Sequence, residues 1–159
     1  MAYLITFHCY GTRLRGDEEG SVDRTRGARG GQLAPSAELV EYGGRAVTHA
    51  EARLDFGQAC TVLAAMRETC GFRGWTLLAA HVRSTHVHVV VDGITATSAV
   101  LRDFKAYASR ALNRDGVRRR WSRGGNVRLL RDARAVRETV HYIVERQGTP
   151  MAVYVAADL

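Results

Sequence analysis

The chain has 159 residues, enough to bury one core of ordinary size and too few for two comfortable domains. Hydrophobic residues make up 46% and charged residues 25%, a balance close to the globular average that argues against global disorder. No apolar run is long enough to span a bilayer, and the start lacks the features of a signal peptide, so the sequence predicts a cytosolic protein.

The net charge of +7 is concentrated in one region of the chain. Residues 1–98 carry ten arginines against ten acidic residues, whereas residues 99–159 carry thirteen basic against six acidic residues. A regional basic surface suggests a polyanionic partner, most commonly nucleic acid. The alternative is a solvated face in an arginine-rich proteome, since 22 of the 23 basic residues are arginine, and charge alone does not separate the two.

The three cysteines, Cys9, Cys60 and Cys70, are widely spaced and form no Cys-x-x-Cys pair. This spacing argues against a cysteine zinc site or a redox motif. We expect buried, reduced thiols.

The first half of the chain predicts a strand, a long loop and a helix. Residues 2–10 are rich in β-branched and aromatic side chains and stop at Gly11, which indicates a buried strand. Residues 13–45 show no sustained periodicity and predict a long loop or a mobile insertion. A helical pattern follows from Thr48 to Gly71. Its expected apolar stripe passes through Leu54, Cys60 or Thr61, Leu63 or Ala64, and Met66 or Arg67.

The second half predicts two strands at residues 75–82 and 86–91, then a helix that Thr97 or Ser98 caps and that ends near residue 114. A short strand follows within residues 121–130, and Asp132 is expected to cap a last helix that stops at Gly148. The expected buried positions of the two helices are Leu101, Phe104, Ala108, Ala111 and Leu112, and then Val136, Val140, Ile143 and Val144.

This order of elements favours a single α+β domain over residues 1–159. Short, sequential strands separated by helices fit an antiparallel sheet of ferredoxin-like or RRM-like type better than a parallel, doubly wound sheet. We find neither an internal repeat nor a glycine-rich phosphate loop in the sequence.

The segment His86-Val87-His88 is the sharpest chemical feature. Side chains alternate along a strand, so both imidazoles face one side of the sheet and Val87 faces the other. Two imidazoles on a rigid strand make half of a metal-coordination sphere. For an isolated His-x-His motif, two half-exposed histidines on a polar sheet face remain the alternative.

Two tyrosines are candidate nucleophiles. Tyr142 lies off the apolar stripe of the last helix, and a phenol can act as a covalent nucleophile if a cation or a metal-bound substrate offsets its ordinary pKa of about 10. Tyr107 lies on the flank of the apolar stripe of the preceding helix, where packing is the more natural role. We therefore rank Tyr107 second.

Together these features resemble the single-tyrosine HUH transposases, which include insertion-sequence transposases and REP-associated tyrosine transposases. The resemblance covers nearly the whole chain, and its core is the His-hydrophobic-His motif followed by a helical tyrosine, here the interval from His88 to Tyr142. The other shared features are the aromatic-rich first strand, a helix with Lys105 and Tyr107, a loop with Trp121, and Ile143 after the helical tyrosine.

The resemblance implies an HUH-type nuclease in which His86 and His88 bind a divalent metal, Mg or Mn, and Tyr142 attacks a phosphate of single-stranded DNA. The product is a 5′-phosphotyrosine and a free 3′-hydroxyl, which allows rejoining without ATP. Hairpin DNA is the implied partner, and the implied particle is a homodimer whose sites can combine the histidines of one subunit with the tyrosine of another. The implied location is the cytoplasm of a prokaryote, on the nucleoid when DNA is bound.

The third metal ligand is an open question in this sequence. The family places Gln or Asn four residues after the tyrosine, but here that position is Arg146. Glu145 offers a carboxylate oxygen, whereas Gln147 has the expected amide but requires a distorted helix end or a loop to turn inward.

The DNA contacts are expected mainly from the basic segment at residues 118–123, which combines phosphate-binding arginines with one aromatic for base stacking. For Trp121, inward packing is the alternative. The candidate DNA-binding residues are Lys105, Arg118, Arg119, Arg120, Trp121, Arg123 and Arg146.

Two other functions compete with the transposase hypothesis. A ferredoxin-like module that binds nucleic acid without catalysis explains the charge but leaves the histidine pair and Tyr142 as coincidence. A small metal hydrolase that uses the histidines and an activated water forms no protein–DNA adduct and tolerates Tyr142→Phe.

Overall fold

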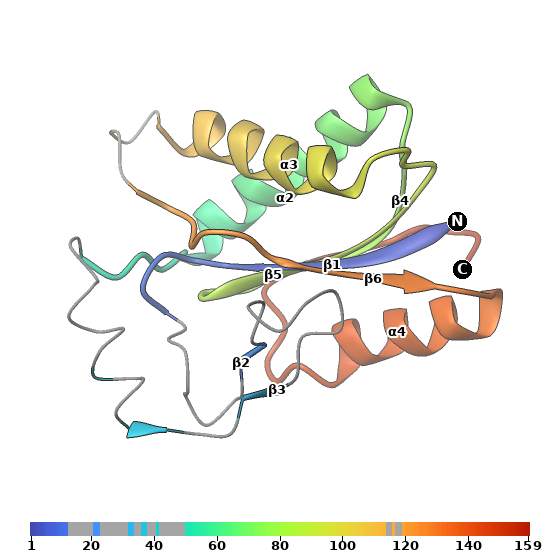
Figure 1. Cartoon of the computed structure of the whole chain (residues 1–159). Helices are drawn as coiled ribbons and strands as arrows, with labels where there is room; N and C mark the ends of the chain where they lie inside the picture. The colour runs from blue at the N-terminus through green and yellow to red at the C-terminus, as the bar shows by residue number, and fades with distance from the viewer. Residues whose placement is uncertain are drawn as a thin grey trace.

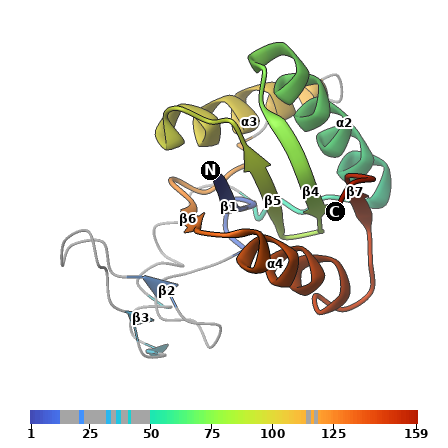
Figure 2. The ribbon, with the colours of Figure 1, turned by 90° about the vertical axis from the view of Figure 1, so that its right-hand side faces the viewer.

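A computed structural model of the chain describes residues 1–12, 21–22, 32–33, 36–37, 41, 50–113, 116 and 119–159. A five-stranded antiparallel sheet lies at its centre, with α2 and α3 on one face and α4 on the other (Figure 1). Figure 2 shows the same layers from the side. The helices are α2 (Phe56–Arg73), α3 (Thr97–Leu112) and α4 (Ala133–Glu145). None of these helices of the described part is long and apolar enough to cross a membrane.

The strands of the sheet follow the spatial order β6-β1-β5-β4-β7. Their bounds are β1 (Ala2–His8), β4 (Thr76–Val82), β5 (His86–Asp92), β6 (Asn126–Leu130) and β7 (Ala152–Val155). The units β1-α2-β4 and β5-α3-β6 give the ferredoxin-like pattern, to which α4 and β7 are added. The predicted α+β fold is confirmed.

The two faces of the sheet have separate apolar cores. On the side of α2 and α3, the core includes Phe7, Val87, Val89 and Phe104. On the side of α4, a smaller core joins the sheet to the helix through Ala2, Ala79, Val90, Leu130, Val136, Val140 and Ile143. Because neighbouring residues of a strand point to opposite faces, β5 contributes to both cores.

The first helix differs from its prediction in start and in register. It begins at Phe56 rather than near Thr48, because Asp55 and Gln58 form a capping box: the Asp55 carboxylate accepts from Gln58 N at 2.8 Å, and Asp55 N donates to Gln58 Oε1 at 3.1 Å. The predicted stripe is correct at Met66 but wrong at Cys60, which is exposed, while Thr61 and Leu63 are half-buried. The buried positions are Ala59, Val62, Ala65, Met66, Thr69 and Cys70. Small apolar residues all around this helix make the sequence periodicity a poor guide to its buried face.

The other helices follow the predictions closely, with two differences. Asp132 caps α4 as predicted and accepts from Ala135 N at 2.7 Å. In α3, however, Ala96 occupies the N-cap position without a side-chain hydrogen bond, so capping by Thr97 or Ser98 is wrong. Moreover, α4 ends at Glu145, three residues before the predicted stop at Gly148.

No pattern in the sequence predicts β7 (Ala152–Val155), a four-residue strand at the edge of the sheet that pairs with β4. Four residues are too few for a period to be recognised, and only the pairing with β4 defines this strand. Most of the predicted loop at residues 13–45 lies outside the described residues. Within it, β2 (Ser21–Val22) and β3 (Gln32–Leu33) form a short antiparallel pair.

Candidate active site on the α4 face of the sheet

The predicted histidine pair lies at the start of β5, the central strand of the sheet. Val87 and Val89 point into the core under α2 and α3, so His86 and His88 point to the face that α4 covers. Their ring centroids are 4.7 Å apart with planes inclined at 75°. The structure thus confirms that the two imidazoles share one face.

Threonine hydroxyls orient both rings. Thr6 Oγ1 lies 2.8 Å from Nδ1 of His88, and Thr85 Oγ1 lies 2.9 Å from Nδ1 of His86. A hydrogen bond at one ring nitrogen selects the nitrogen through which a histidine binds a metal. With Nδ1 engaged by a threonine in each ring, Nε2 is the nitrogen that each histidine presents for coordination.

His88 is held in the neutral form. Burial, followed by the neighbouring His86 imidazole, lowers the pKa of His88 from 6.5 to about 3, although hydrogen bonding with the Gln147 side chain opposes this shift. A neutral imidazole is the form that binds a metal.

Two further histidines that the sequence analysis did not single out lie on the same face. The His8 ring lies 5.5 Å from that of His86, its partner across the β1–β5 pair. His81 is the β4 partner of His88 and is completely buried. Strand alternation alone gives each of them an even chance of either face, and only the register places them beside the predicted pair.

His81 fastens the end of α4 to the sheet. Its Nδ1–H donates to the carbonyl oxygen of Ile143 at 2.7 Å, and its Nε2 accepts from the amide of Met151 at 3.3 Å. These two backbone groups flank the turn at residues 146–150. Burial lowers the pKa of His81, which keeps the ring neutral and able to donate and accept at once.

Gln147 turns inward in this fastened segment. Because α4 ends at Glu145, residue 147 is no longer part of the helix, and its side chain lies near enough to His88 to oppose the lowering of the pKa of that imidazole. This is the loop that the sequence analysis required for Gln147 to reach the pair. Glu145, the other candidate ligand, is exposed on the last turn of the helix.

Tyr142 lies on the helix that covers the histidine face and is 51% exposed, as its position off the apolar stripe predicts. The flank of α4 that carries Tyr142 also carries Thr139, one turn earlier. Thr139 Oγ1 accepts from Arg128 of β6 at 3.1 Å, so this flank faces the β6 side of the sheet. Tyr142 also directly precedes Ile143, the residue bonded to His81. The backbone next to Tyr142 is therefore held against β4, where His81 is the register partner of His88.

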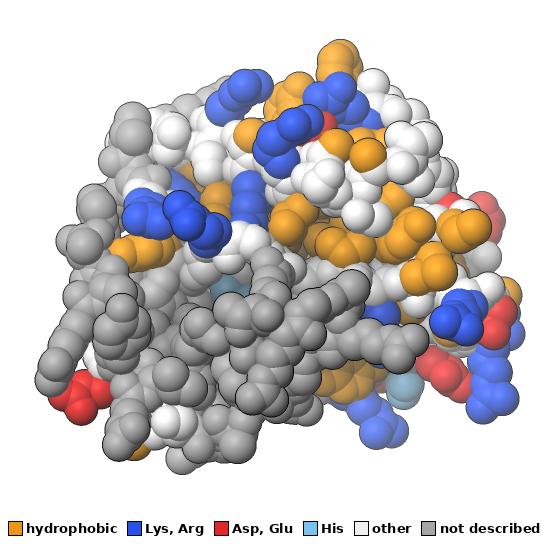
Figure 3. Space-filling model, viewed as in Figure 1, with side chains coloured by type: hydrophobic (Ala, Val, Ile, Leu, Met, Phe, Trp, Pro, Cys, Tyr) orange, Lys and Arg blue, Asp and Glu red, His pale blue; other side chains and the backbone are white. Residues whose placement is uncertain are grey.

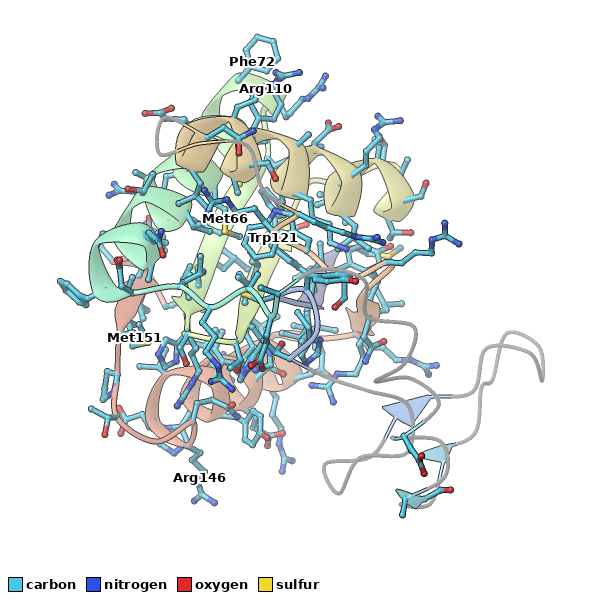
Figure 4. All side chains as sticks on the ribbon, turned by 90° about the vertical axis from the view of Figure 1, so that its left-hand side faces the viewer. Met66, Phe72, Arg110, Trp121, Arg146 and Met151 are labelled. Carbon is cyan, nitrogen blue, oxygen red and sulfur yellow. The ribbon has the colours of Figure 1, made fainter. Side chains whose placement is uncertain are left out.

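Tyr107, the second candidate nucleophile, lies on the opposite side of the sheet. It is part of α3, whose buried residues pack into the core on the other face. Its ring lies 6.5 Å from that of Phe72, and the Arg110 guanidinium stacks on it at 5.1 Å. Figure 4 shows Phe72 and Arg110 together at the outer side of these two helices. The sheet separates Tyr107 from the histidine pair.

The residues of the basic segment have different environments. Trp121 packs inward: its ring meets Phe7 edge-on at 5.0 Å, and its Nε1–H lies near Lys105 O and Ser109 Oγ, at 3.2 and 2.9 Å (Figure 4). Lys105 Nζ donates to the carbonyl oxygens of Ser122 and Gly124. Both side chains thus hold the segment onto α3, which is the packing alternative considered for Trp121.

The predicted DNA-binding arginines divide into buried and exposed groups. Arg120 is only 6% exposed and donates to the carbonyl oxygen of Leu112 at 3.0 Å, so its guanidinium is not available at the surface. Arg119 stacks on the Tyr10 ring at 4.5 Å and is exposed, as is Arg123. Arg146 is exposed and projects outward from the end of α4 (Figure 4). Arg118 lies outside the described residues.

The exposed arginines of this segment lie at the same end of the sheet as the histidines. Cys9 forms a β-bridge with Trp121, and the amide of Ser122 donates to the carbonyl oxygen of His8 at 2.9 Å. Figure 3 shows Lys and Arg side chains gathered over the stretch between α3 and β6. The surface that carries Arg119 and Arg123 is therefore adjacent to the face of the sheet that carries the histidines.

A metal site of two imidazoles and one amide fits the donors on this face. The amide oxygen of Gln147 is a hard ligand of the kind that Mg and Mn take, and imidazole suits Mn better than Mg. Within the described ranges, no cluster of three or more His, Cys, Asp or Glu side chains has a geometry that holds a metal. Among the described residues, Gln147 is a further oxygen donor that lies near His88.

A cavity of about 420 Å³ lies at the other end of the α4 face, lined by residues that include Met1, Asp92, Arg131 and Val136. Asp92 is the last residue of β5, whereas His86 is the first, so the length of this strand separates the cavity from the histidine pair. The cavity is therefore not part of the candidate active site.

The fold is similar to a solved structure of a REP-associated tyrosine transposase bound to a REP hairpin, with a TM-score of 0.55 and 16% sequence identity. The similarity covers 91% of this chain and 65% of that chain, so the protein spans about two thirds of the length of the transposase. No protein-family model matches the sequence, and no curated protein matches it. At this identity the similarity establishes the fold, a five-stranded antiparallel sheet with three helices packed on it.

Proposed function

We propose that this protein is a metal-dependent single-stranded DNA endonuclease and strand transferase of the HUH type, which recognises hairpin DNA and acts through Tyr142. The observation that carries the proposal is the position of α4. This helix packs on the face of the sheet that bears His86 and His88, and Gln147 follows its end and influences the pKa of His88. The similar structure of a REP-associated tyrosine transposase with a REP hairpin supports the same proposal.

Tyr142 is the nucleophile in this proposal. Its phenol oxygen forms a bond to phosphorus and loses its proton, while the bond from phosphorus to the 3′-oxygen breaks and that oxygen gains a proton as the leaving group. The products are a 5′-phosphotyrosine and a free 3′-hydroxyl. Because one phosphate ester replaces another, the bond energy is conserved and a second 3′-hydroxyl can reverse the step.

His86, His88 and Gln147 would hold a divalent ion, Mn or Mg, at the scissile phosphate. When bound, the ion polarises the phosphate and neutralises charge that develops in the transition state. Thr6 and Thr85 fix the ring orientations, and His81 holds the turn that presents Gln147. The exposed Arg119, Arg123 and Arg146 supply phosphate contacts outside this centre.

The test is to incubate the protein with labelled hairpin oligonucleotides that carry randomised single-stranded flanks, in the presence of Mn, and to look for a covalent adduct on a denaturing gel. We expect an adduct that Tyr142→Phe abolishes and that Tyr107→Phe, the matched change on the other side of the sheet, leaves intact. Metal-dependent cleavage without an adduct would instead favour a hydrolase that activates water. Binding without cleavage would favour a non-catalytic nucleic-acid-binding module.

A further inference from the structure

We infer that Arg128 of β6 is a further DNA-contacting residue of this site, which binds a backbone phosphate on the flank of α4 that carries Tyr142. The inference rests on the proposed function and adds a residue that the sequence motif does not include. Arg128 lies outside the basic segment at residues 118–123.

The register of the sheet places Arg128 on the histidine face. Arg128 is the β6 partner of Leu4, and Leu4 packs against the core under α4. Asn126 is the partner of Thr6, which in turn pairs with His88. Arg128 therefore lies two residues further along β6 than the row that contains His88, a distance of roughly 7 Å along the strand.

The contact with Thr139 directs the guanidinium to the nucleophile's flank. Nη2 of Arg128 donates to Thr139 Oγ1 at 3.1 Å, and Thr139 precedes Tyr142 by three residues on the helix. Residues three apart on a helix are surface neighbours. The long side chain of Arg128 thus crosses from the edge of the sheet toward the flank on which Tyr142 is exposed.

No carboxylate of the described residues compensates the charge of Arg128. By contrast, Arg134 pairs with Glu138 at 2.7 Å and Arg73 pairs with Asp103 at 2.9 Å. The bond to Thr139 uses one of the five N–H donors of the guanidinium and leaves an exposed residue with donors directed to solvent. A planar, permanently charged donor of this kind suits phosphate oxygens.

The experiment measures binding of a labelled hairpin oligonucleotide with a single-stranded flank, without divalent metal and on a Tyr142→Phe background that prevents the covalent step. We expect Arg128→Ala to weaken binding roughly tenfold, the size of one lost charge-assisted hydrogen bond. We also expect it to reduce the slope of log K against log salt by about 0.7, the value for one phosphate contact on a single strand. Arg128→Lys keeps the charge and should keep most of the slope.

Two variants separate this role from alternatives. Arg137→Ala removes an equal charge from an exposed residue on the other flank of α4, and Thr139→Val removes the acceptor that Arg128 uses while keeping the packing of the helix. If Arg137→Ala lowers the slope as much as Arg128→Ala, Arg128 is only part of the general charge and the inference fails. It also fails if Thr139→Val and Arg128→Ala weaken binding equally while neither lowers the slope, because Arg128 then only supports α4. If the parent protein binds no oligonucleotide, the proposed function fails together with it.

Discussion

The two faces of the central sheet are built from the same strands, but they differ in what their side chains do. On the face under α2 and α3, Phe7, Val87, Val89 and Phe104 are completely buried in one continuous apolar core. On the face under α4, the apolar core covers only part of the sheet, and the other part carries four histidines and Thr6. Alternation along each strand therefore lets one face stabilise the fold while the other positions polar groups.

We therefore expect substitutions on the face under α2 and α3 to affect mainly stability, and substitutions of the histidines on the face under α4 to affect mainly activity. Large side chains in the closed core contribute most of their burial energy to folding. The imidazoles of His81 and His88 on the other face gain less from burial, since it lowers their pKa, and their hydrogen bonds instead fix orientation.

The largest effect on stability is expected from Phe104→Ala. This side chain is completely buried and meets Trp75 edge-on at 5.8 Å, so its removal leaves a cavity in the closed core. We expect the free energy of unfolding to fall by about 3–5 kcal/mol, measured by urea denaturation. A loss below 1 kcal/mol would mean that this face is not the stabilising one.

A large effect on activity, with little effect on folding, is expected from His88→Ala. We expect the yield of covalent adduct to fall at least about a hundredfold, the size found when one electrostatic group is removed from a transition state. Chelation of the metal should give the same loss in the parent protein. The urea midpoint of His88→Ala should remain much closer to that of the parent than the midpoint of Phe104→Ala does. Full activity in this variant would remove His88 from the proposed metal site.

Mixing two inactive variants tests whether one chain builds the site. Because α4 packs on the sheet of this chain, we expect Tyr142 to act with the histidines of the same chain. An equimolar mixture of Tyr142→Phe and His88→Ala should form no adduct on a denaturing gel. Recovery of adduct in the mixture would show that subunits exchange α4, and light scattering on the same samples would report whether a homodimer forms.

A moderate loss of stability is expected from His81→Phe, which keeps a ring but removes both hydrogen bonds. The carbonyl of Ile143 and the amide of Met151 lose their partner, and each unsatisfied buried group costs about 1–3 kcal/mol. The matched control is His141→Ala on the exposed side of α4, which should change the free energy of unfolding by less than about 0.5 kcal/mol. If His81→Phe and His141→Ala lowered the free energy of unfolding equally, the hydrogen bonds of His81 would not stabilise the attachment of α4 to the sheet.

The smallest effect is a dependence of stability on pH. Because the pKa of His88 is lowered from 6.5 to about 3, the unfolded chain takes up a proton first as the pH falls. The contribution of His88 to the free energy of unfolding is therefore fully present above pH 6.5 and is lost progressively between pH 6.5 and about 3. We expect a loss on the order of 1–2 kcal/mol from pH 7 to pH 5 by urea denaturation, and a smaller loss in His88→Ala. Identical pH profiles in the two proteins would show that His88 is not buried in the neutral form.

The sequence by itself determined the elements that have strong local signals. Alternation placed His86 and His88 on one face, and the Asp132 cap with the apolar stripe placed Tyr142 on the outside of the last helix. These features follow from the periodicity of strands and helices, which can be recognised in a short stretch of consecutive residues. The order of strands and helices also sufficed to predict the ferredoxin-like α+β fold.

Only the tertiary structure decided which distant residues meet these elements. His81 faces α4 because β4 pairs with β5 in this register, and Gln147 reaches His88 because α4 ends at Glu145. The burial of Arg120, the inward packing of Trp121 and the placement of Arg128 beside Thr139 likewise depend on contacts between separate elements. Local periodicity carries no information on strand register or on helix docking, because these depend on packing between elements.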